Sequence, residues 1–235
     1  MLDLTLAHHS NSGGFAWAQE QVQQHHYLRR RVDPRTRPLA YIAHLEGQRV
    51  GCLIFGRPES TRCYQGDLTY GSLDDVARGR AQYSRWEVIN LARVWLSPVV
   101  QRGGALYEPG LLPGFTDRRG VWRSTLASTV VGMALERVGY DYLLAHPPVW
   151  IEQPYQLRVC LSYCDLSFHQ GTIYRASGFA LARQNRWKIE TWMKPLPPLT
   201  AEQDAEVQQR ALRSPRSRWH RAQQEQGECR QLALW

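Results

Sequence analysis

"SRWEVINLARVWLSP", residues 84–98, is the stretch that decides the fold. Its apolar residues would cover both faces of an extended chain, as they do in strands buried inside a sheet. A strand at a wet surface would instead alternate apolar and polar residues. We therefore predict that this segment is the central strand of a sheet with helices packed on it.

The flanking segments predict the rest of a mixed α/β sheet. Residues 15–30 have the pattern of a short amphipathic helix, and 38–58 that of a β-hairpin around "EGQR". Residues 58–83 are polar and predict a long loop. Helical spacing over 121–139 predicts a helix that Gly139 ends. Further strands are expected in 141–148, 155–165 and 179–185, with a helix from Ser167 to about Ser177.

The predicted fold is a single α/β domain over residues 1–195. Prolines at 195, 197 and 198 close it. Residues 196–235, rich in Arg and Gln, predict a basic tail that is partly helical or disordered.

Charge points to a polyanionic partner. The chain of 235 residues holds 29 Lys and Arg against 21 Asp and Glu, a net charge of +8. Arginines gather in "RRRVDPRTR" (29–37) and "RALRSPRSRWHR" (210–221). Basic clusters with aromatic residues attract a phosphate backbone, although a solvated basic surface has the same composition.

Other classes are disfavoured. No stretch approaches the roughly 20 apolar residues that span a bilayer, and the first residues lack a secretory pattern. Five scattered cysteines do not form a disulfide framework. Cys160 and Cys164 would lie about 13 Å apart on one strand, too far to share a zinc ion. We expect a cytoplasmic protein without a membrane partner.

The polar stretch "SYCDLSFHQGTIYRASGF" (162–179) carries candidate site residues. Asp165 ends a predicted strand, where ligands bind in open α/β sheets, but a turn role is equally consistent. Ser167 and Gln170 match a capping box. His169 would lie in the first helical turn, where the dipole favours neutral imidazole. Tyr174 either packs or faces a pocket, and its phenol needs a partner if it is buried.

Arg93 is the anomaly of the central strand. A guanidinium in an otherwise apolar run needs a partner, because an uncompensated buried charge costs several kcal/mol. We predict that Arg93 meets Asp165 or an anionic ligand, and a strand end at which it reaches water is the alternative.

Two further features suggest binding sites. His26 and Tyr27 end the first helix, and with Asp165 and His169 they are candidate metal ligands, although spacing alone cannot assemble them. The segment "DRRGVWR" (117–123) precedes a predicted helix start, where backbone N–H groups bind anions. It keeps one glycine of the Q/R-x-x-G-x-G/A loop with which GNAT acetyltransferases bind the cofactor's pyrophosphate, so acetyl-CoA is in doubt.

Four segments together resemble the Mom proteins of phage and prophage: "HHYL" (25–28), "LARVW" (91–95), "RSTLAS" (123–128) and "SYCD…HQGTIYRASGF". The resemblance spans residues 20–185 and implies a GNAT-like fold and modification of adenine N6 in double-stranded DNA to carbamoylmethyladenine, which protects phage DNA from restriction. The host cytoplasm is then the expected location. The resemblance places catalytic positions at six residues: His26, Tyr27, Arg93, Ser124, Asp165 and Tyr174.

On this interpretation the substrate is held by Ser162, Tyr163, His169 and Gly171, and Tyr163, Tyr174 or Trp95 stacks on an extruded base. Phosphates are bound by arginines of two segments, Arg29, Arg30 and Arg31 in one and Arg118, Arg119 and Arg123 in the other. Iron has been proposed as a cofactor in the family, with His26, Tyr27 and Asp165 as its candidate ligands here.

The cofactor and donor stay open, with an acyl or glycine-type donor among the candidates, and so does a homodimer. Two other functions fit the same residues. A conventional N-acyltransferase would bind CoA tightly and ignore DNA. A non-catalytic DNA-binding accessory protein would bind DNA through its arginines and alter no base.

Overall fold

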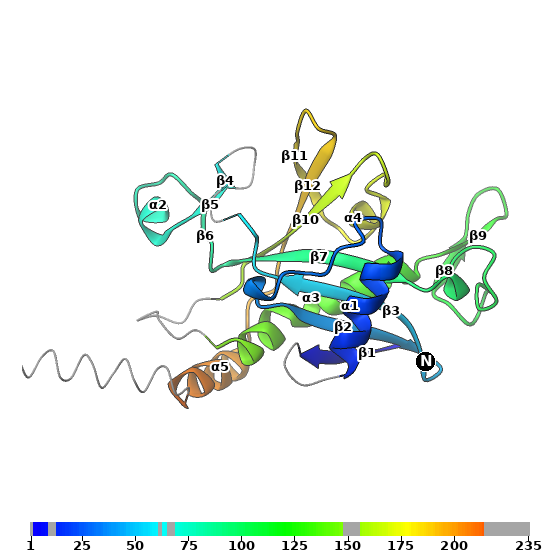
Figure 1. The fold of residues 1–235 in the computed structure, drawn as a ribbon, viewed down its shortest axis with the longest axis horizontal. Coiled ribbons are helices and arrows are strands. Elements are labelled where there is room, and N and C mark those ends of the chain that lie inside the picture. The colour runs from blue at the N-terminus through cyan, green and yellow to red at the C-terminus, as the bar shows by residue number, and fades with distance from the viewer. Residues whose placement is uncertain (1, 9–12, 61–62, 65–68, 148–155, 214–235) are drawn as a thin grey trace, which may run out of the picture.

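The computed structural model describes residues 2–8, 13–60, 63–64, 69–147 and 156–213. Its centre is one seven-stranded mixed sheet in the order β1-β2-β3-β7-β10-β12-β11 (Figure 1). The strands are β1 (Leu2–His8), β2 (Leu39–Leu45), β3 (Gln48–Gly56), β7 (Val88–Leu96), β10 (Val159–Asp165), β11 (Ala180–Gln184) and β12 (Ile189–Pro195). The segment 84–98 thus supplies the central strand, and the predicted fold class is confirmed.

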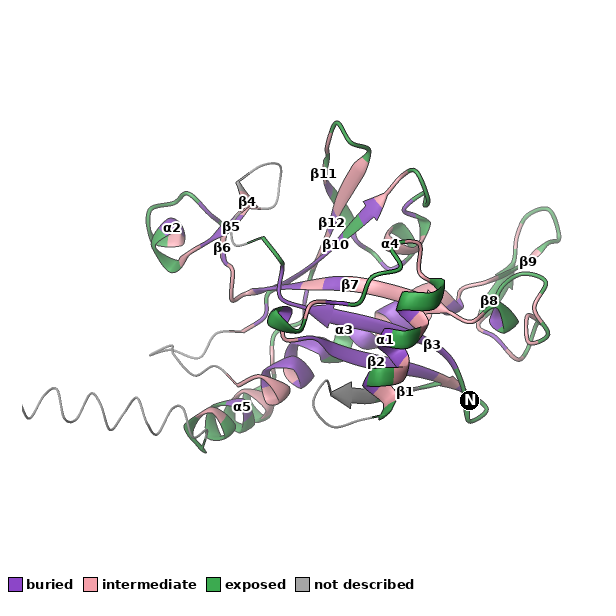
Figure 2. Ribbon diagram, in the orientation of Figure 1, coloured by how far each residue is buried: buried purple, intermediate pink, exposed green. Residues whose placement is uncertain are grey.

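Helices cover both faces of the sheet, which explains why its inner strands are apolar throughout. On β2, Ala40 and Ile42 pack with helix α1 (Gly13–His25). Tyr41 and Ala43 point the other way, into the core formed with α3 (Leu126–Ala145). Figure 2 shows the buried residues concentrated in these central strands and in the helix faces against them.

The predicted hairpin of 38–58 is confirmed as β2 and β3. Its turn places Glu46 and Gly47 at φ of 49° and 78°. Two successive positive φ values are the mark of the tight hairpin turns whose twist matches that of the strands. Two short 3-10 helices, Pro34–Thr36 and Pro98–Val100, border the sheet.

The predicted helix of 121–139 has different ends. Trp122–Ser124 is a strand, β9, which pairs with β8 (Gly114–Thr116), so α3 begins only at Leu126. Gly139 does not end the helix, and 141–145 is its last part rather than a strand. Tyr142 and Leu143 are fully buried there, and this burial outweighs the roughly 1 kcal/mol by which glycine disfavours a helix.

Residues 58–83 are more ordered than the predicted loop. They hold β4 (Cys63–Tyr64), β5 (Thr69–Gly71) and helix α2 (Leu73–Ala77), and β5 also pairs with β6 (Tyr83–Ser84).

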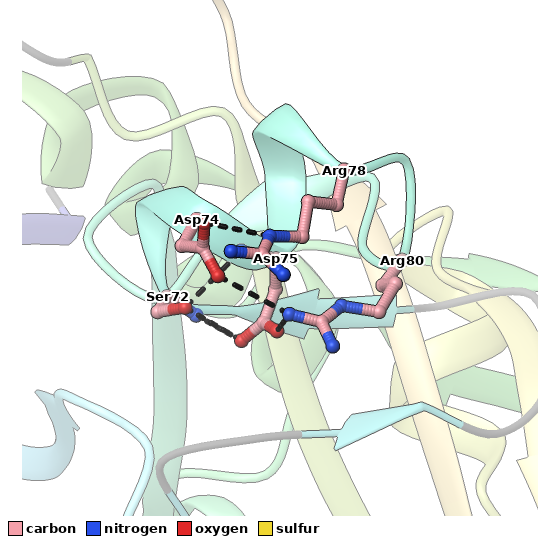
Figure 3. Close-up of polar contacts among 5 residues, drawn as sticks. All are labelled: Ser72, Asp74, Asp75, Arg78 and Arg80. Carbon is pink, nitrogen blue, oxygen red and sulfur yellow. Dashed lines mark hydrogen bonds and ion pairs between the residues drawn. The ribbon is translucent and has the colours of Figure 1, made fainter.

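Charged side chains hold α2 in place (Figure 3). Ser72 and Asp75 form a reciprocal capping box at its start. Asp75 is buried and also pairs with Arg80 at 2.9 Å, while Asp74 contacts Arg78 at 2.9 Å. Sequence reasoning missed this unit because its elements are only two to five residues long.

The C-terminal part also differs in detail. The strand predicted at 179–185 is β11, but β12 follows it and lies between β10 and β11. Helix α5 (Ala201–Arg213) packs on α3, with Val207 buried and the Tyr140 hydroxyl donating to Glu206. Most of the arginine cluster at 210–221 lies outside the described residues.

Two negative findings hold for the described residues. None of their helices has the length and apolar character needed to cross a membrane. No disulfide joins the cysteines among them, which are Cys52, Cys63, Cys160 and Cys164.

Candidate functional site

The central sheet opens between its two parallel strands. β7 and β10 pair only at Val159–Val88, Cys160–Ile89 and Leu161–Asn90. Beyond these pairs the strands separate, and the buried Ser162 Oγ donates to the Leu91 carbonyl at 2.8 Å. A cleft of about 520 Å³ lies at the opening.

Five segments meet around this cleft: the end of α1, the second half of β7, the first turn of α3, β10, and the turn that leads into α4 (Thr172–Ala176). Its lining includes seven predicted site residues, His26, Tyr27, Arg93, Tyr163, His169, Gly171 and Tyr174. Segments that lie far apart in the sequence thus converge on one cleft.

His26 enters the cleft as a neutral donor. α1 ends at His25, and the Leu28 N–H donates to Nδ1 of His26 at 3.2 Å. This bond leaves the proton of the neutral ring on Nε2. Burial, then the charge of Arg93, then His169 lower the pKa of His26 from 6.5 to about 4. The ring is therefore uncharged at neutral pH.

Tyr27 is the centre of an aromatic wall. Its ring lies 4.4 Å from that of His26, stacks on Phe168 at 4.9 Å, and meets His169 edge-on at 4.8 Å. Burial raises the pKa of Tyr27. The exposed Phe168 extends this wall to the surface.

Two more tyrosines line the cleft. Tyr174 stacks on Trp192 at 6.0 Å, its hydroxyl donates to the Tyr163 carbonyl at 3.4 Å, and burial raises its pKa to about 12, so it stays protonated. Burial raises the pKa of Tyr70, and Tyr163, which is 41% exposed, lies close enough to help raise it. Tyr70 belongs to the segment predicted as loop and was not foreseen.

Arg93 does not pair with Asp165, contrary to our prediction. Its Nη1 donates to the adjacent Ala92 carbonyl at 2.6 Å, and its buried Nε has no partner. Burial is the main cause that lowers its pKa, while Tyr27 and, second, Glu59 act to raise it. Within the described chain no carboxylate forms an ion pair with Arg93, whose side chain lines the cleft.

Asp165 has the turn role that we left open. Its Oδ1 accepts the Ser167 N–H at 2.9 Å, and its carbonyl accepts those of Phe168 and His169 at 3.1 and 3.0 Å. Asp165 therefore positions the cleft wall without lining it. The capping box predicted for Ser167 is wrong, because the segment is a turn and α4 begins only at Thr172.

Gly171 has a steric role. It is buried at φ +66° before α4, and a Cβ would lie 2.8 Å from Cζ2 of Trp192. Both the backbone conformation and this contact require glycine.

Three other expectations need correction. Ser124 does not line the cleft, and its Oγ donates to the Pro113 carbonyl and accepts the Leu126 N–H at the start of α3. Trp95 lies against α1, stacked on His25, so it cannot stack on a base in the cleft. The single glycine of 117–123, Gly120, stands in the β8–β9 turn at φ +74° and not at a helix start.

The predicted phosphate-binding arginines fall on two surfaces. Arg29, Arg30 and Arg31 are exposed directly after the aromatic wall, and Arg30 is close enough to lower the pKa of Arg93. The others lie on the β8–β9 hairpin, which projects from the molecule away from α4 (Figure 1). Of these, Arg123 pairs with Asp117 at 3.0 Å.

The cleft does not fit a metal ion. Across the described ranges, no group of three or more His, Cys, Asp or Glu side chains could hold one. His26 and His169 do share the cleft with Tyr27, but Arg93 disfavours positive charge beside them. The aspartate expected to complete the set, Asp165, is engaged by the turn.

Several lining residues were not predicted, among them Phe168, Gln170 and Ala127. Phe168 carried a usable signal, because a large apolar residue within a polar turn is rarely there for packing alone. Ala127 carried none, since small residues are common in any buried helix.

Solved structures with a similar fold were found. They include a Bacillus subtilis acetyltransferase in complex with CoA (9% identity, 84% of this chain and 100% of that chain, TM-score 0.41). Another is a GNAT family acetyltransferase from Elizabethkingia anophelis with acetyl-CoA bound (11%, 83% and 98%, TM-score 0.38). A third is the AHL synthase LasI (10%, 84% and 91%, TM-score 0.44). No protein-family model matches the chain. No curated protein matches it either.

The cleft combines flat aromatic walls, a cation without an ion-pair partner and a neutral hydrogen-bond donor, Nε2–H of His26, beside the protonated phenol of Tyr174. Aromatic walls bind planar groups by stacking, and the guanidinium binds an anion or a developing negative charge. Such a cleft can bring a flat heterocycle beside an anionic or carbonyl-bearing group.

Proposed function

We propose that this protein is a transferase that modifies an exocyclic amine of a DNA base, and that the base enters the cleft between β7 and β10. The observation that carries the proposal is the Arg93 guanidinium, which lines an aromatic-walled cleft without an ion-pair partner and with its Nε unsatisfied. A half-buried cation without a carboxylate at contact distance is costly, and a ligand with negative charge offsets that cost.

Base chemistry suits the dimensions and walls of this cleft. An exocyclic amine in duplex DNA is paired, so the enzyme has to extrude the base for a few kcal/mol of unstacking. The stacked pair Tyr27 and Phe168, together with Tyr163 and Tyr174, offers aromatic surfaces to the extruded base. Stacking of this kind returns about 1–3 kcal/mol per base.

The remaining groups have roles in the transfer. A bond forms between the amine nitrogen and the donor carbon, the donor's leaving group departs with its electron pair, and the amine proton passes to solvent. Arg93 binds the anionic or carbonyl part of the donor, and His26 Nε2–H donates to the same region. Tyr174, kept protonated by burial, turns its hydroxyl from the Tyr163 carbonyl to the leaving atom and donates to it. Asp165 is a positioning residue in this scheme.

The basic surface supplies the DNA contact. Arg29, Arg30 and Arg31 follow the cleft wall directly and are exposed, so they bind phosphates beside the extruded base. Arg118 and Arg119 on the β8–β9 hairpin bind the duplex further away. The likeness of four segments to Mom proteins supports adenine N6 as the target and carbamoylmethyl as the group added.

The test is chemical analysis of DNA from cells that express the protein. Total DNA is digested to nucleosides, and mass spectrometry is used to search for a heavier deoxyadenosine. Arg93→Ala and Asp165→Asn should both remove this product without loss of folding. The first variant loses the cation that binds the donor, and the second loses the carboxylate charge that positions residues 166–169. Arg183→Ala, on β11 outside the cleft, is the matched control.

A digest without modified base from soluble protein, in cells that also carry the genes of a phage with a Mom protein, contradicts the proposal. The conventional N-acyltransferase is then tested by calorimetry, because it requires tight CoA binding that is independent of DNA.

A further inference from the structure

The tip of the β11–β12 hairpin presents a tryptophan to solvent. Trp187 is 68% exposed, and no other large apolar side chain in the described ranges is more exposed. The hairpin rises from the sheet beyond β10, with both layers of helices below it (Figure 1). Tryptophan buries a large area when it finds a partner, so its exposure at a tip indicates an interaction surface.

The tip is rigid. Asn185 Oδ1 accepts the N–H groups of Trp187 and Ile189, each at 2.9 Å, and the Asn185 carbonyl accepts that of Lys188 at 3.1 Å. Lys188 adopts a left-handed conformation at φ +58°. These bonds hold the tryptophan outward, so little conformational entropy is lost when it binds.

Positive charge surrounds this tryptophan. The Arg186 guanidinium lies 4.7 Å from the centre of the Trp187 ring, and both Arg186 and Lys188 are exposed. The nearest acid along the hairpin is Glu190, which accepts a hydrogen bond from Nε1 of Trp192 at 2.9 Å. An exposed ring with a cation on either side of it in the sequence complements a polyanion that carries flat groups, as nucleic acids do.

The tip also stands beside the cleft. The Leu166 N–H donates to the Lys188 carbonyl at 3.0 Å, and Ile189 pairs with Asp165. Two residues after Leu166 comes Phe168, which is 62% exposed and stacks on Tyr27 at the cleft wall. One hydrogen-bonded connection therefore links the exposed tryptophan to the wall that receives the base.

We infer that Trp187 is a wedge that enters the base stack of double-stranded DNA, while Arg186 and Lys188 bind phosphates on either side. This inference rests on the proposed function, since extrusion of one base leaves a gap that an apolar side chain can fill. Apolar wedges inserted between base steps offset the cost of unstacking in other DNA-bending proteins. A wedge near the cleft would keep the extruded base from returning.

The test uses short duplexes in which 2-aminopurine replaces adenine in a range of sequence contexts, with protein but no donor. Fluorescence of this base rises when it unstacks. Wild-type protein should raise it in at least one context. Trp187→Ala should lose most of the rise and bind the duplex about tenfold more weakly, the usual order for loss of a stacking side chain. Trp187→Phe should restore most of both.

Two controls separate the wedge from a general effect. Leu181→Ala removes another exposed apolar side chain, 45% exposed on β11 of the same hairpin, and should change neither signal. The double variant Arg186→Gln/Lys188→Gln should weaken binding uniformly and reduce the slope of log K against log salt by about 2.

A fluorescence rise by Trp187→Ala equal to that of the wild type overturns the inference. The inference is also overturned if Trp187→Ala loses binding to anionic phospholipid vesicles but binds DNA as the wild type does. That result would make the tip a membrane contact. If Trp187→Ala still gives modified adenine in cells at the wild-type level, the wedge is refuted while the proposed function stands. If the fluorescence depends on Trp187 but no modified base forms, the wedge stands and the transfer reaction fails.

Discussion

Replacement of Arg93 by methionine should stabilise the protein while abolishing its activity. The Nε atom of Arg93 is buried without a partner, and burial lowers the pKa of the guanidinium, so the surroundings disfavour its charge. Methionine replaces the aliphatic part of the arginine with a flexible apolar chain, and it has no charge and no buried N–H that needs an acceptor.

The expected gain follows from that unmet hydrogen bond and from the desolvated charge. An unsatisfied buried polar group costs about 1–3 kcal/mol, and replacing even a buried ion pair with apolar groups of similar volume is neutral or stabilises proteins by about 1–4 kcal/mol. Because Arg93 is only partly buried, we take the lower part, about 1–2 kcal/mol. In a chain of 235 residues each kcal/mol shifts Tm by about 2–4 °C, so the rise should be about 2–8 °C.

The assay is calorimetry together with urea unfolding, which gives the free energy of unfolding and confirms that its denaturant slope is unchanged. Arg118→Met is the matched control, because Arg118 is exposed and should shift stability by less than about 0.5 kcal/mol. A lower Tm for Arg93→Met would refute the reasoning, since it would mean that the guanidinium is already compensated.

Three further outcomes are expected. His26 has a pKa near 4 in the folded protein against 6.5 unfolded, so the unfolded chain binds more protons between these values and stability falls as pH falls through that window. The loss near pH 4 should be about 1–2 kcal/mol after solvent screening, and urea unfolding against pH should be flatter for His26→Gln. Tyr41→Phe removes a donor at 2.7 Å from the buried Asp141 carboxylate and should cost about 1.5–3 kcal/mol by urea unfolding; no change would mean that solvent replaces the bond. Gly171→Ala places a Cβ 2.8 Å from Trp192 at φ +66°. It should lower the free energy of unfolding by about 1–3 kcal/mol and reduce the amount of modified adenine. Retained activity would show that the turn adapts.

Much of the sheet could be predicted because its signals are local. The apolar run of 84–98 needs cover on both faces wherever it lies, and the turn at Glu46 and Gly47 fixes the hairpin register within a few residues. The start of α3 could not be predicted. Trp122–Ser124 has a pattern that suits a helix or a strand, and only its pairing with Gly114–Thr116 decides between them.

The sequence predicted which residues belong to the candidate site better than it predicted which of them are in contact. It identified Arg93 as a charge in an apolar strand, but the partner of Arg93 depends on how two strands run in space. Arg93 lies three residues beyond Asn90, and Asp165 lies four beyond Leu161, the last parallel pair. Because β7 and β10 separate from that pair onward, the two side chains reach different surroundings.

The opening between β7 and β10 limits how substrate specificity can evolve. Both strands lie in the interior of the sheet, so an insertion within either one would shift the alternation of its side chains and expose core residues. The segments after the strands and after α1, residues 166–171 and 26–31, can vary in length without such a penalty. Adaptation to a larger base or another donor should therefore arise in these two connections, while β7 and β10 keep their register.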